Sequence, residues 1–197
     1  DARRAGAGTA RISNIAGGTT PGRVELGSAN RTFAVESGLA RDDIEITAAV
    51  TGTGGIIKTG AGAMRLAGPG TYTGGTTLGL GTLTGGILEA ASNTALGTGS
   101  VTINSGTLSL RSNNPAGGFG NDLRSVAAAA SIDIDQLDNA GAPGTFRFGA
   151  GTLGGSLDVA GNGTLSIGSG VQTHTLASPY GEEALAADAR LKEVSRS

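Results

Sequence analysis

The sequence lacks several of the residue types on which common sites depend. Its 197 residues include no cysteine, no tryptophan, one histidine, five prolines and only 3% aromatic residues. Disulfides, thiolate metal sites and histidine metal clusters are therefore excluded. The formal net charge of −2 provides no charge excess for binding nucleic acid or anionic lipid. No run of 18 apolar residues is present to form a membrane helix.

The first residues, Asp-Ala-Arg-Arg, include neither a methionine nor an apolar run of signal-peptide type. We therefore expect the chain to be a processed or excised piece of a longer protein. Any targeting signals would then lie outside it.

Glycine is the residue that the chain has in excess, with 37 of 197 positions, against an average of about 7%. Leu, Ile, Val and Phe together reach only about a fifth of the chain, close to the lower limit for a folded protein. A core this thin suffices if it is drawn out into short layers, because a solenoid is stabilised by contacts between neighbouring layers. Composition alone therefore favours a repetitive fold over one large core.

Alternation of apolar with polar or small residues recurs along the chain and is bounded by glycine-rich turns, which predicts strands of four to seven residues. The residues predicted to face outward are Glu45, Arg65, Thr102, Ser109, Asp133, Arg147, Asp158 and Ser166. The inward pairs are Phe33/Val35, Ile44/Ile46, Met64/Leu66, Val101/Ile103, Leu108/Leu110, Ile132/Ile134, Phe146/Phe148, Leu157/Val159 and Leu165/Ile167.

A loose internal repeat accompanies these strands. Gly-Thr-Leu begins at Gly81, Gly106, Gly151 and Gly163, and Gly62 opens a similar Gly-Ala-Met. The period varies as it does in a β-helix whose turns differ in loop length. A β-sandwich also uses many short strands, but hairpin dipeptides are scarce here. We therefore predict an all-β right-handed parallel β-helix, with the sandwich as the alternative.

Between residues 58 and 110 a longer pattern appears: a lysine, a glycine, an apolar-x-apolar strand, a glycine, Thr-Tyr-x-Gly-x-Thr, Gly-Thr-Leu and Ala-Leu-Gly-x-Gly. Its positions are Lys58, Gly60, Met64, Leu66, Gly68, Thr71, Tyr72, Gly74, Thr76, Gly81 to Leu83, Ala95, Leu96, Gly97 and Gly99. This stretch resembles the autotransporter-associated β-strand repeat, a passenger-domain repeat of large bacterial secreted and surface proteins.

The resemblance extends more loosely over residues 31–170. It implies a secreted or surface-displayed β-helix, and it specifies no ligand. Gly70 stands where asparagine usually precedes Thr-Tyr, so the resemblance implies no asparagine ladder at that corner. Met64 stands where leucine is usual. Glycines would allow the tight corners of each coil, and threonines with Tyr72 would stack on equivalent residues above and below.

Acidic residues provide the candidates for chemistry. Asp133 and Asp135 share one strand face, with Asp138 following, and such a pair could bind calcium or act as acid and base on a sugar. We favour a solvated outer face for them, and also for Asp42, Asp43 and Glu45. The segment Gly117–Ser125 nearly fits a calcium nonapeptide with Asp122 as ligand, but Arg124 occupies the apolar position and no tandem copy follows. We interpret it as a loop.

The remaining candidates are interpreted as surface features. His174 lacks a Gly-x-Ser-x-Gly elbow and any second histidine. The sequons at Asn30 and Asn162 are incidental in a bacterial protein. Two tyrosines, Tyr72 and Tyr180, are too few for a sugar platform. The scattered arginines, without interleaved aromatics, make a poor nucleic-acid surface; they are Arg3, Arg4, Arg11 and Arg23.

The last residues differ from the rest of the chain. Ala184, Ala187, Leu191 and Val194 recur at helical spacing, with acids early and bases late. We predict a short amphipathic helix over 181–197 that caps the last coil or begins another segment. The β-helix itself would span 1–180, with the clearest repeat at 56–110.

From the sequence we therefore expect a non-enzymatic extracellular scaffold or spacer of an autotransporter-like protein, associated with the outer membrane through a region outside this chain and serving adhesion or display. The alternatives are a polysaccharide-degrading β-helix enzyme, with Asp133 and Asp135 as first suspects, and a self-associating matrix component. No cofactor, metal, nucleic acid or direct membrane insertion is expected. The expected partners are host or matrix surface molecules or glycans, and adjacent coils of the parent chain.

Overall fold

The computed structural model describes residues 8–13, 22–111, 119–125, 130–134, 145–149, 151–153, 157–161 and 164–167. These residues form short strands and connecting turns, with no helix among them. The strands are β1 (Ala10–Ile12), β2 (Arg23–Glu25), β3 (Arg31–Ala34), β4 (Ile44–Ile46), β5 (Ala49–Thr51), β6 (Ile56–Thr59), β7 (Ala63–Leu66), β8 (Thr76–Leu78), β9 (Ile87–Ala90), β10 (Val101–Ile103), β11 (Gly106–Leu110), β12 (Leu123–Ser125), β13 (Ala130–Ile134), β14 (Thr145–Phe148), β15 (Gly151–Leu153), β16 (Leu157–Gly161) and β17 (Thr164–Ile167).

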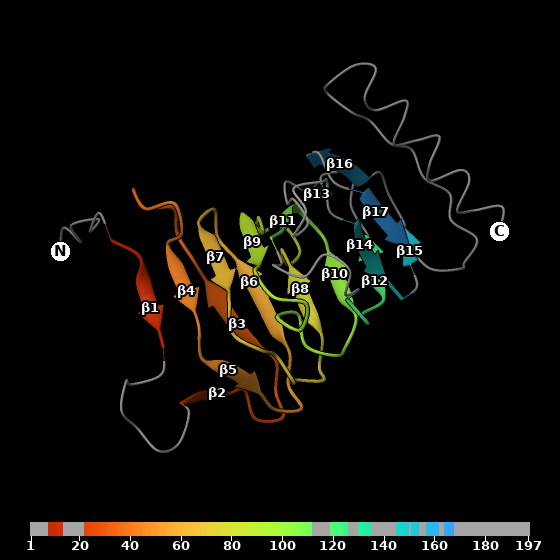
Figure 1. The fold of residues 1–197 in the computed structure, drawn as a ribbon. Helices are drawn as coiled ribbons and strands as arrows, with labels where there is room; N and C mark the ends of the chain where they lie inside the picture. The colour runs from red at the N-terminus through yellow and green to blue at the C-terminus, as the bar shows by residue number, and fades with distance from the viewer. Residues whose placement is uncertain are drawn as a thin grey trace, which may run out of the picture.

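These strands stack into parallel sheets that form a β-solenoid (Figure 1). One sheet has seven strands in the order β1-β4-β7-β9-β11-β13-β16, and a second has six in the order β15-β12-β10-β8-β6-β3. The pairs β2-β5 and β14-β17 form two smaller sheets. All the pairings between these strands are parallel. The predicted parallel β-solenoid is therefore confirmed, and the sandwich alternative, which needs antiparallel sheets, is wrong.

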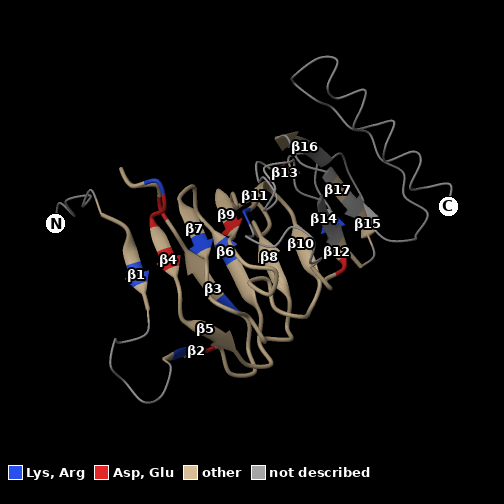
Figure 2. Ribbon diagram, viewed as in Figure 1, with Lys and Arg blue, Asp and Glu red and all other residues tan. Residues whose placement is uncertain are grey.

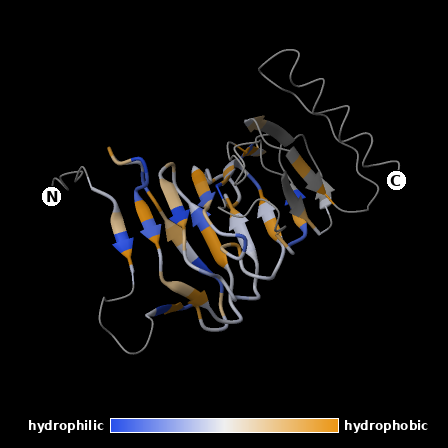
Figure 3. Cartoon of the chain, in the orientation of Figure 1, coloured by the Kyte–Doolittle hydropathy of each residue, from blue (hydrophilic) through white to orange (hydrophobic). Residues whose placement is uncertain are grey.

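The core follows the predicted alternation. Equivalent positions in the successive strands β4, β7, β9, β11 and β13 of the seven-stranded sheet hold fully or almost fully buried apolar residues, namely Ile46, Leu66, Ala90, Leu110 and Ile134. Successive strand residues point to opposite faces, so the residue before each of them points outward. Figure 3 shows the result as hydrophilic bands flanked by hydrophobic ones on β4, β7 and β9.

All nine predicted strands are present, but two features of the prediction are wrong. Several strands have only three residues, and eight others lack a recognised pattern: β1, β2, β5, β6, β8, β9, β12 and β15. Tight corners explain the short strands. At Gly106 the backbone has φ +94°, and a Cβ atom there would lie 2.5 Å from the Gly86 carbonyl oxygen of the neighbouring coil. Only glycine fits such a corner without strain.

Polar side chains also enter the interior. Tyr72 is fully buried, and its hydroxyl lies 2.6 Å from Thr76 Oγ1 and donates to the Ala95 carbonyl oxygen at 3.2 Å. Burial raises the pKa of this phenol, and the hydrogen bond with Thr76 acts in the opposite direction. Buried Asn121 donates through Nδ2 to the carbonyl of Gly99 at 2.6 Å. Tyr72 therefore hydrogen-bonds the coil that follows its own, and Asn121 hydrogen-bonds the coil that precedes its own. Tyr72 thus joins two coils through its burial and a hydrogen bond, whereas the sequence predicted stacking on equivalent residues.

Among the described residues, no helix is long and apolar enough to span a bilayer. The predicted amphipathic helix over 181–197 lies outside the described residues. The hand of the coils stays a prediction.

Candidate functional site

A row of charged side chains crosses the outer face of the seven-stranded sheet. The strand register aligns Arg11 of β1 with Glu45 of β4, Glu45 with Arg65 of β7, and Arg65 with Glu89 of β9. We call these four residues the charged row. Figure 2 shows its alternating sign as blue on β1, red on β4, blue on β7 and red on β9. Aligned side chains in neighbouring strands are close enough to interact directly.

Each link of the charged row is an ion pair. Arg11 Nη2 lies 2.7 Å from Glu45 Oε2, and Arg65 Nε lies 3.2 Å from Glu45 Oε1. The second contact is not aligned as a hydrogen bond, since Arg65 Nε has no hydrogen-bond partner. Arg65 Nη1 also pairs with Glu89 Oε1. Glu45 and Arg65 each form ion pairs with residues on both neighbouring strands, so ion pairs connect the four strands without a break.

A loop reinforces the last link. Arg41, between β3 and β4, places Nη2 3.0 Å from Glu89 Oε2. Arg41 is 72% exposed and Glu89 only 6%, so the arginine covers the carboxylate from the solvent side. Asp43 fastens the loop by accepting hydrogen bonds from the amides of Gly38 at 2.6 Å and Ala63 at 2.8 Å. Glu89 is therefore a buried carboxylate with two arginine partners.

Beyond Glu89 the same register continues to Ser109, Asp133 and Ala160. Ser109 lies on the outer face, as predicted, and it is buried there. It stands between two longer side chains, Glu89 and Asp133. Asp133 pairs with Arg111, whose Nη2 lies 2.7 Å from Asp133 Oδ2.

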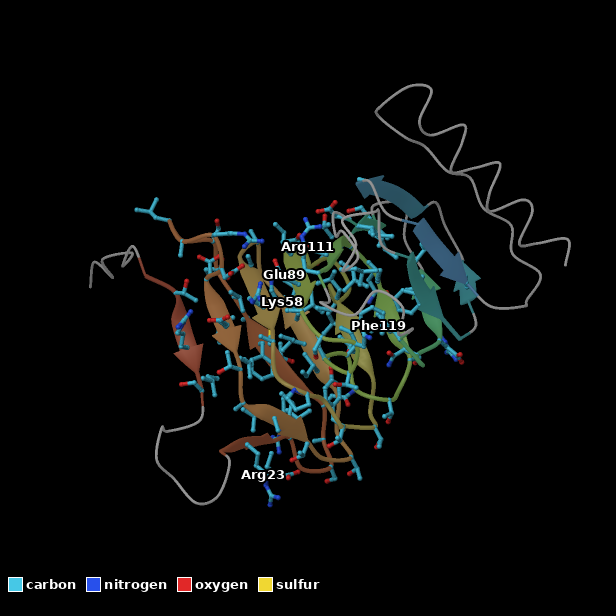
Figure 4. The ribbon with its side chains drawn as sticks, viewed as in Figure 1. Arg23, Lys58, Glu89, Arg111 and Phe119 are labelled. Carbon is cyan, nitrogen blue, oxygen red and sulfur yellow. The ribbon has the colours of Figure 1, made fainter. Side chains whose placement is uncertain are left out.

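This ion pair bears on the predicted acid pair. In the structure Asp133 is neutralised by Arg111, while Asp135 and Asp138 lie outside the described residues. The ion pair with Arg111 occupies an oxygen of the one member of the predicted acid pair that the structure describes. Figure 4 shows Arg111 and Glu89 on the same side of the molecule, with Arg23 far from both.

The other sequence candidates are not gathered at one place. His174, Asn162 and Tyr180 lie outside the described residues. The part of the chain that the structure describes holds no group of three or more His, Cys, Asp or Glu side chains with metal-binding geometry. Asn30, in a predicted sequon, accepts a hydrogen bond from the Gly55 amide at 2.8 Å and so links two coils. Outside the row, Glu25 has a pKa lowered by hydrogen bonds from Thr51 and the Gly27 amide.

Lys58 is a buried charged residue whose role the sequence analysis did not predict. It is fully buried in β6, and its ammonium donates to the carbonyl oxygens of Thr59 at 3.1 Å, Gly60 at 2.8 Å and Gly85 at 2.8 Å. Burial lowers its pKa to about 8, while the charges of Asp43 and Glu36 act in the opposite direction. All three donors of the ammonium are used, so Lys58 joins two corners of the solenoid.

The sequence does contain one indication that Lys58 is buried. In an extended Ile56-Ile57-Lys58 segment, Lys58 lies on the same strand face as Ile56. A lysine is so seldom fully buried that hydrophobic patterning assigned no strand to this segment.

A small apolar projection stands between β8 and β9. Leu80 and Leu83 exchange backbone hydrogen bonds of 3.2 and 2.9 Å across a tight turn, and both side chains are exposed. Ile87, at the start of β9, is exposed as well. We call Leu80, Leu83 and Ile87 the leucine projection.

The charged row therefore consists of groups that bind one another, and the interior polar groups bind carbonyls of adjacent coils. Such an arrangement holds coils in register. No family model, curated protein or solved structure matches this chain.

Proposed function

We propose that this chain is a non-enzymatic scaffold or spacer segment of an extracellular, autotransporter-like surface or secreted protein, and that it serves display or adhesion. The class of parent protein rests on the repeat resemblance over residues 58–110. The scaffold role rests on one structural observation, namely that the charged row commits its side chains to coupling successive coils.

A spacer must transmit force and position along its axis, so its coils must not slide or separate. Backbone ladders supply part of this resistance, and the charged row adds a second continuous set of contacts along the same axis. Lys58 and Asn121 add further links in the interior through the carbonyls of neighbouring coils. Function in solenoids resides in extended faces supported by such stacking.

Adhesion would require an exposed contact surface in addition. Among the described residues, the leucine projection supplies three exposed apolar side chains within eight positions of the chain, and the tight turn between Leu80 and Leu83 fixes the backbone of two of them.

The proposal is tested by display on cells. The full chain is placed between a distal epitope and an outer-membrane β-barrel anchor, and the epitope is counted on intact cells before and after external protease. We expect surface display that survives protease, and a strong loss of display in Leu108→Asp, which puts a charge at a fully buried core position. The matched control is Thr82→Asp, at an exposed turn position.

Two results would overturn the proposal. One is equal protease sensitivity of the unchanged chain and Leu108→Asp, which would show that the displayed segment has no folded spacer. The other is shortening of any member of a panel of acidic and neutral polysaccharides by the purified chain, which would favour the enzyme alternative.

A further inference from the structure

One edge of the solenoid is formed by the first strands of three of the four sheets. β1 ends the seven-stranded sheet, β3 ends the six-stranded sheet and β2 ends one two-stranded sheet. We call these three strands the β1 edge. Figure 1 shows β1 as the outermost strand on its side of the stack.

The backbone of the β1 edge presents hydrogen-bonding groups outward. The Ala10 amide donates to the Asp43 carbonyl at 2.9 Å, and the Ile12 carbonyl accepts from the Thr47 amide at 2.9 Å. Because peptide groups alternate in direction along a strand, the N–H and C=O of Arg11 point away from β4. Such an edge is a template for another strand.

The side chains of the β1 edge are apolar on their inner side. Ile12 aligns with Ile46, and Ile46 with Leu66, in one inward column. Ile46 and Leu66 are buried, whereas Ile12 is 37% exposed. Val24 of β2 likewise aligns with buried Val50 but is only partly covered. The edge is thus a cross-section of the solenoid core, and none of the described strands pairs with its outer side.

The charged row adds chemical selectivity. Arg65, inside the row, has a glutamate on each side, while Arg11, at its end, pairs among the described residues with Glu45 alone and is 69% exposed. The alternation leaves a position for a negative charge on the open side of Arg11. A basic residue there would place two like charges opposite each other, which is unfavourable.

We infer that the β1 edge docks a further parallel β-coil whose strand places an acidic side chain opposite Arg11, with apolar side chains opposite Ala10 and Ile12. The strand that already packs on the other side of β1 has this pattern, Ile44-Glu45-Ile46. Docking would bury Ile12 and extend three sheets at once, continuing the interface between coils that the structure already contains. This inference stands whether or not the chain is a displayed spacer.

A second copy of the chain does not fit this edge well. The last strand of the seven-stranded sheet, β16, carries Ala160 in the register of the charged row and Gly161 in the register of Ile12. Stacking end to end in the continuing register would put Ala160 opposite Arg11 and Gly161 opposite Ile12. Neither an ion pair nor an apolar contact would form. The last described strand of this sheet therefore lacks the residues that the β1 edge selects.

The experiment adds such a coil to the full chain. A copy of residues 44–63 is fused ahead of Asp1, which places the copied Ile44 29 residues before Ala10. The chain's own coils span this range, because the register pairs Ile44 with Met64, 20 residues on, and Ala10 with Ile44, 34 residues on. Amide hydrogen exchange of Arg11 and Thr32 reports on the edge, and exchange of Leu108 confirms that the core is folded.

Four proteins are compared: the unfused chain, the fusion, the fusion with Glu45→Lys in the copy, and the fusion with Glu45→Gln in the copy. We expect the first fusion to slow Arg11 exchange at least about tenfold relative to the unfused chain. The lysine copy should lose most of this protection, and the glutamine copy, which removes the charge and keeps the length of the side chain, should protect Arg11 less than the glutamate copy and more than the lysine copy.

Three results would overturn the inference. Equal protection by the glutamate and lysine copies would show that charge does not select the coil. Arg11 exchange in the unfused chain as slow as that of Arg65 would show that the chain covers its own edge. Protection that rises with protein concentration, together with a dimer in sedimentation, would identify a second copy as the occupant.

Discussion

The buried ammonium of Lys58 predicts that the free energy of unfolding increases as the pH rises above about 8. Its ordinary pKa of 10.5 falls to about 8 in the folded protein, mainly because burial penalises the charged form. Between these two values the unfolded chain holds a proton that the folded chain has released. Unfolding then takes up a proton, so the free energy of unfolding rises with pH from about 8 to 10.5. Below that window the cost of burying the charge is present in full, and above it the cost is absent.

The size of the effect follows from the two pKa values. A tenfold difference in proton affinity is worth about 1.4 kcal/mol, so the interval from about 8 to 10.5 corresponds to about 3 kcal/mol. This figure is an upper limit, since the carbonyls of Thr59, Gly60 and Gly85 accept hydrogen bonds that favour the charged ammonium. A gain of about 1 to 3 kcal/mol is therefore expected.

Urea unfolding at a series of pH values from 7 to 10.5 measures this gain. The reference is Lys58→Met, which keeps the length of the side chain and removes the titrating group. Subtracting the reference cancels titrations that both proteins share, including that of Tyr72, whose raised pKa has the opposite effect above pH 10. A difference between the two proteins that stays constant or falls from pH 8 to 10.5 would refute the reasoning from burial.

Three substitutions test other parts of the structure by thermal or urea unfolding. Glu89→Ala should destabilise the protein by about 2 kcal/mol because it leaves two arginines without their buried partner. The control Asp122→Ala, which removes an exposed carboxylate, should change stability by less than about 0.5 kcal/mol, and equal effects of the two substitutions would contradict the charged row. Gly106→Ala should lower the free energy of unfolding by more than about 2 kcal/mol, because alanine is strained at a positive φ and its Cβ would clash with backbone. The control Gly120→Ala, whose added Cβ has no atom within 4 Å, should leave stability nearly unchanged. Tyr72→Phe should cost about 1 to 2 kcal/mol through the lost hydroxyl bonds, and an unchanged midpoint would show that these bonds contribute nothing.

Much of the fold could be predicted from the sequence because the core obeys a simple alternation. Pairs such as Leu108/Leu110 and Ile132/Ile134 are separated by one outward residue, and glycines mark the corners around them. Their burial follows from the period of two in a strand. Strands that carry polar residues inward escaped prediction for the same reason. In β8 the inward residues are Thr76 and Leu78, and Thr76 is buried because it hydrogen-bonds Tyr72 and the Leu96 carbonyl.

The charged row could be predicted only in part. Glu45 and Arg65 were assigned to the outer face, but their alignment depends on the register between coils, and the spacing of the coils is irregular. Glu89 was missed because Ile87-Leu88-Glu89-Ala90 ends in a small residue and shows no clear alternation. The partnership of Glu89 with Arg41 joins residues 48 positions apart through a loop, and no local pattern reports such a contact.

Hydrophobic burial alone does not specify the register of these coils. If β7 slipped by two residues along β4, Met64 would face Ile46 and Leu66 would face Ala48, so apolar residues would still lie against apolar residues. The same slip would move Arg65 from Glu45 to Thr47, removing an ion pair and exchanging a carboxylate for a hydroxyl. A two-residue slip thus weakens the aligned ion pairs while it leaves apolar contacts in place. The charged row therefore favours the native register in addition to the stability that its buried member Glu89 provides, and a repetitive, glycine-rich solenoid needs that selectivity because its strands are short and its inward residues are interchangeable.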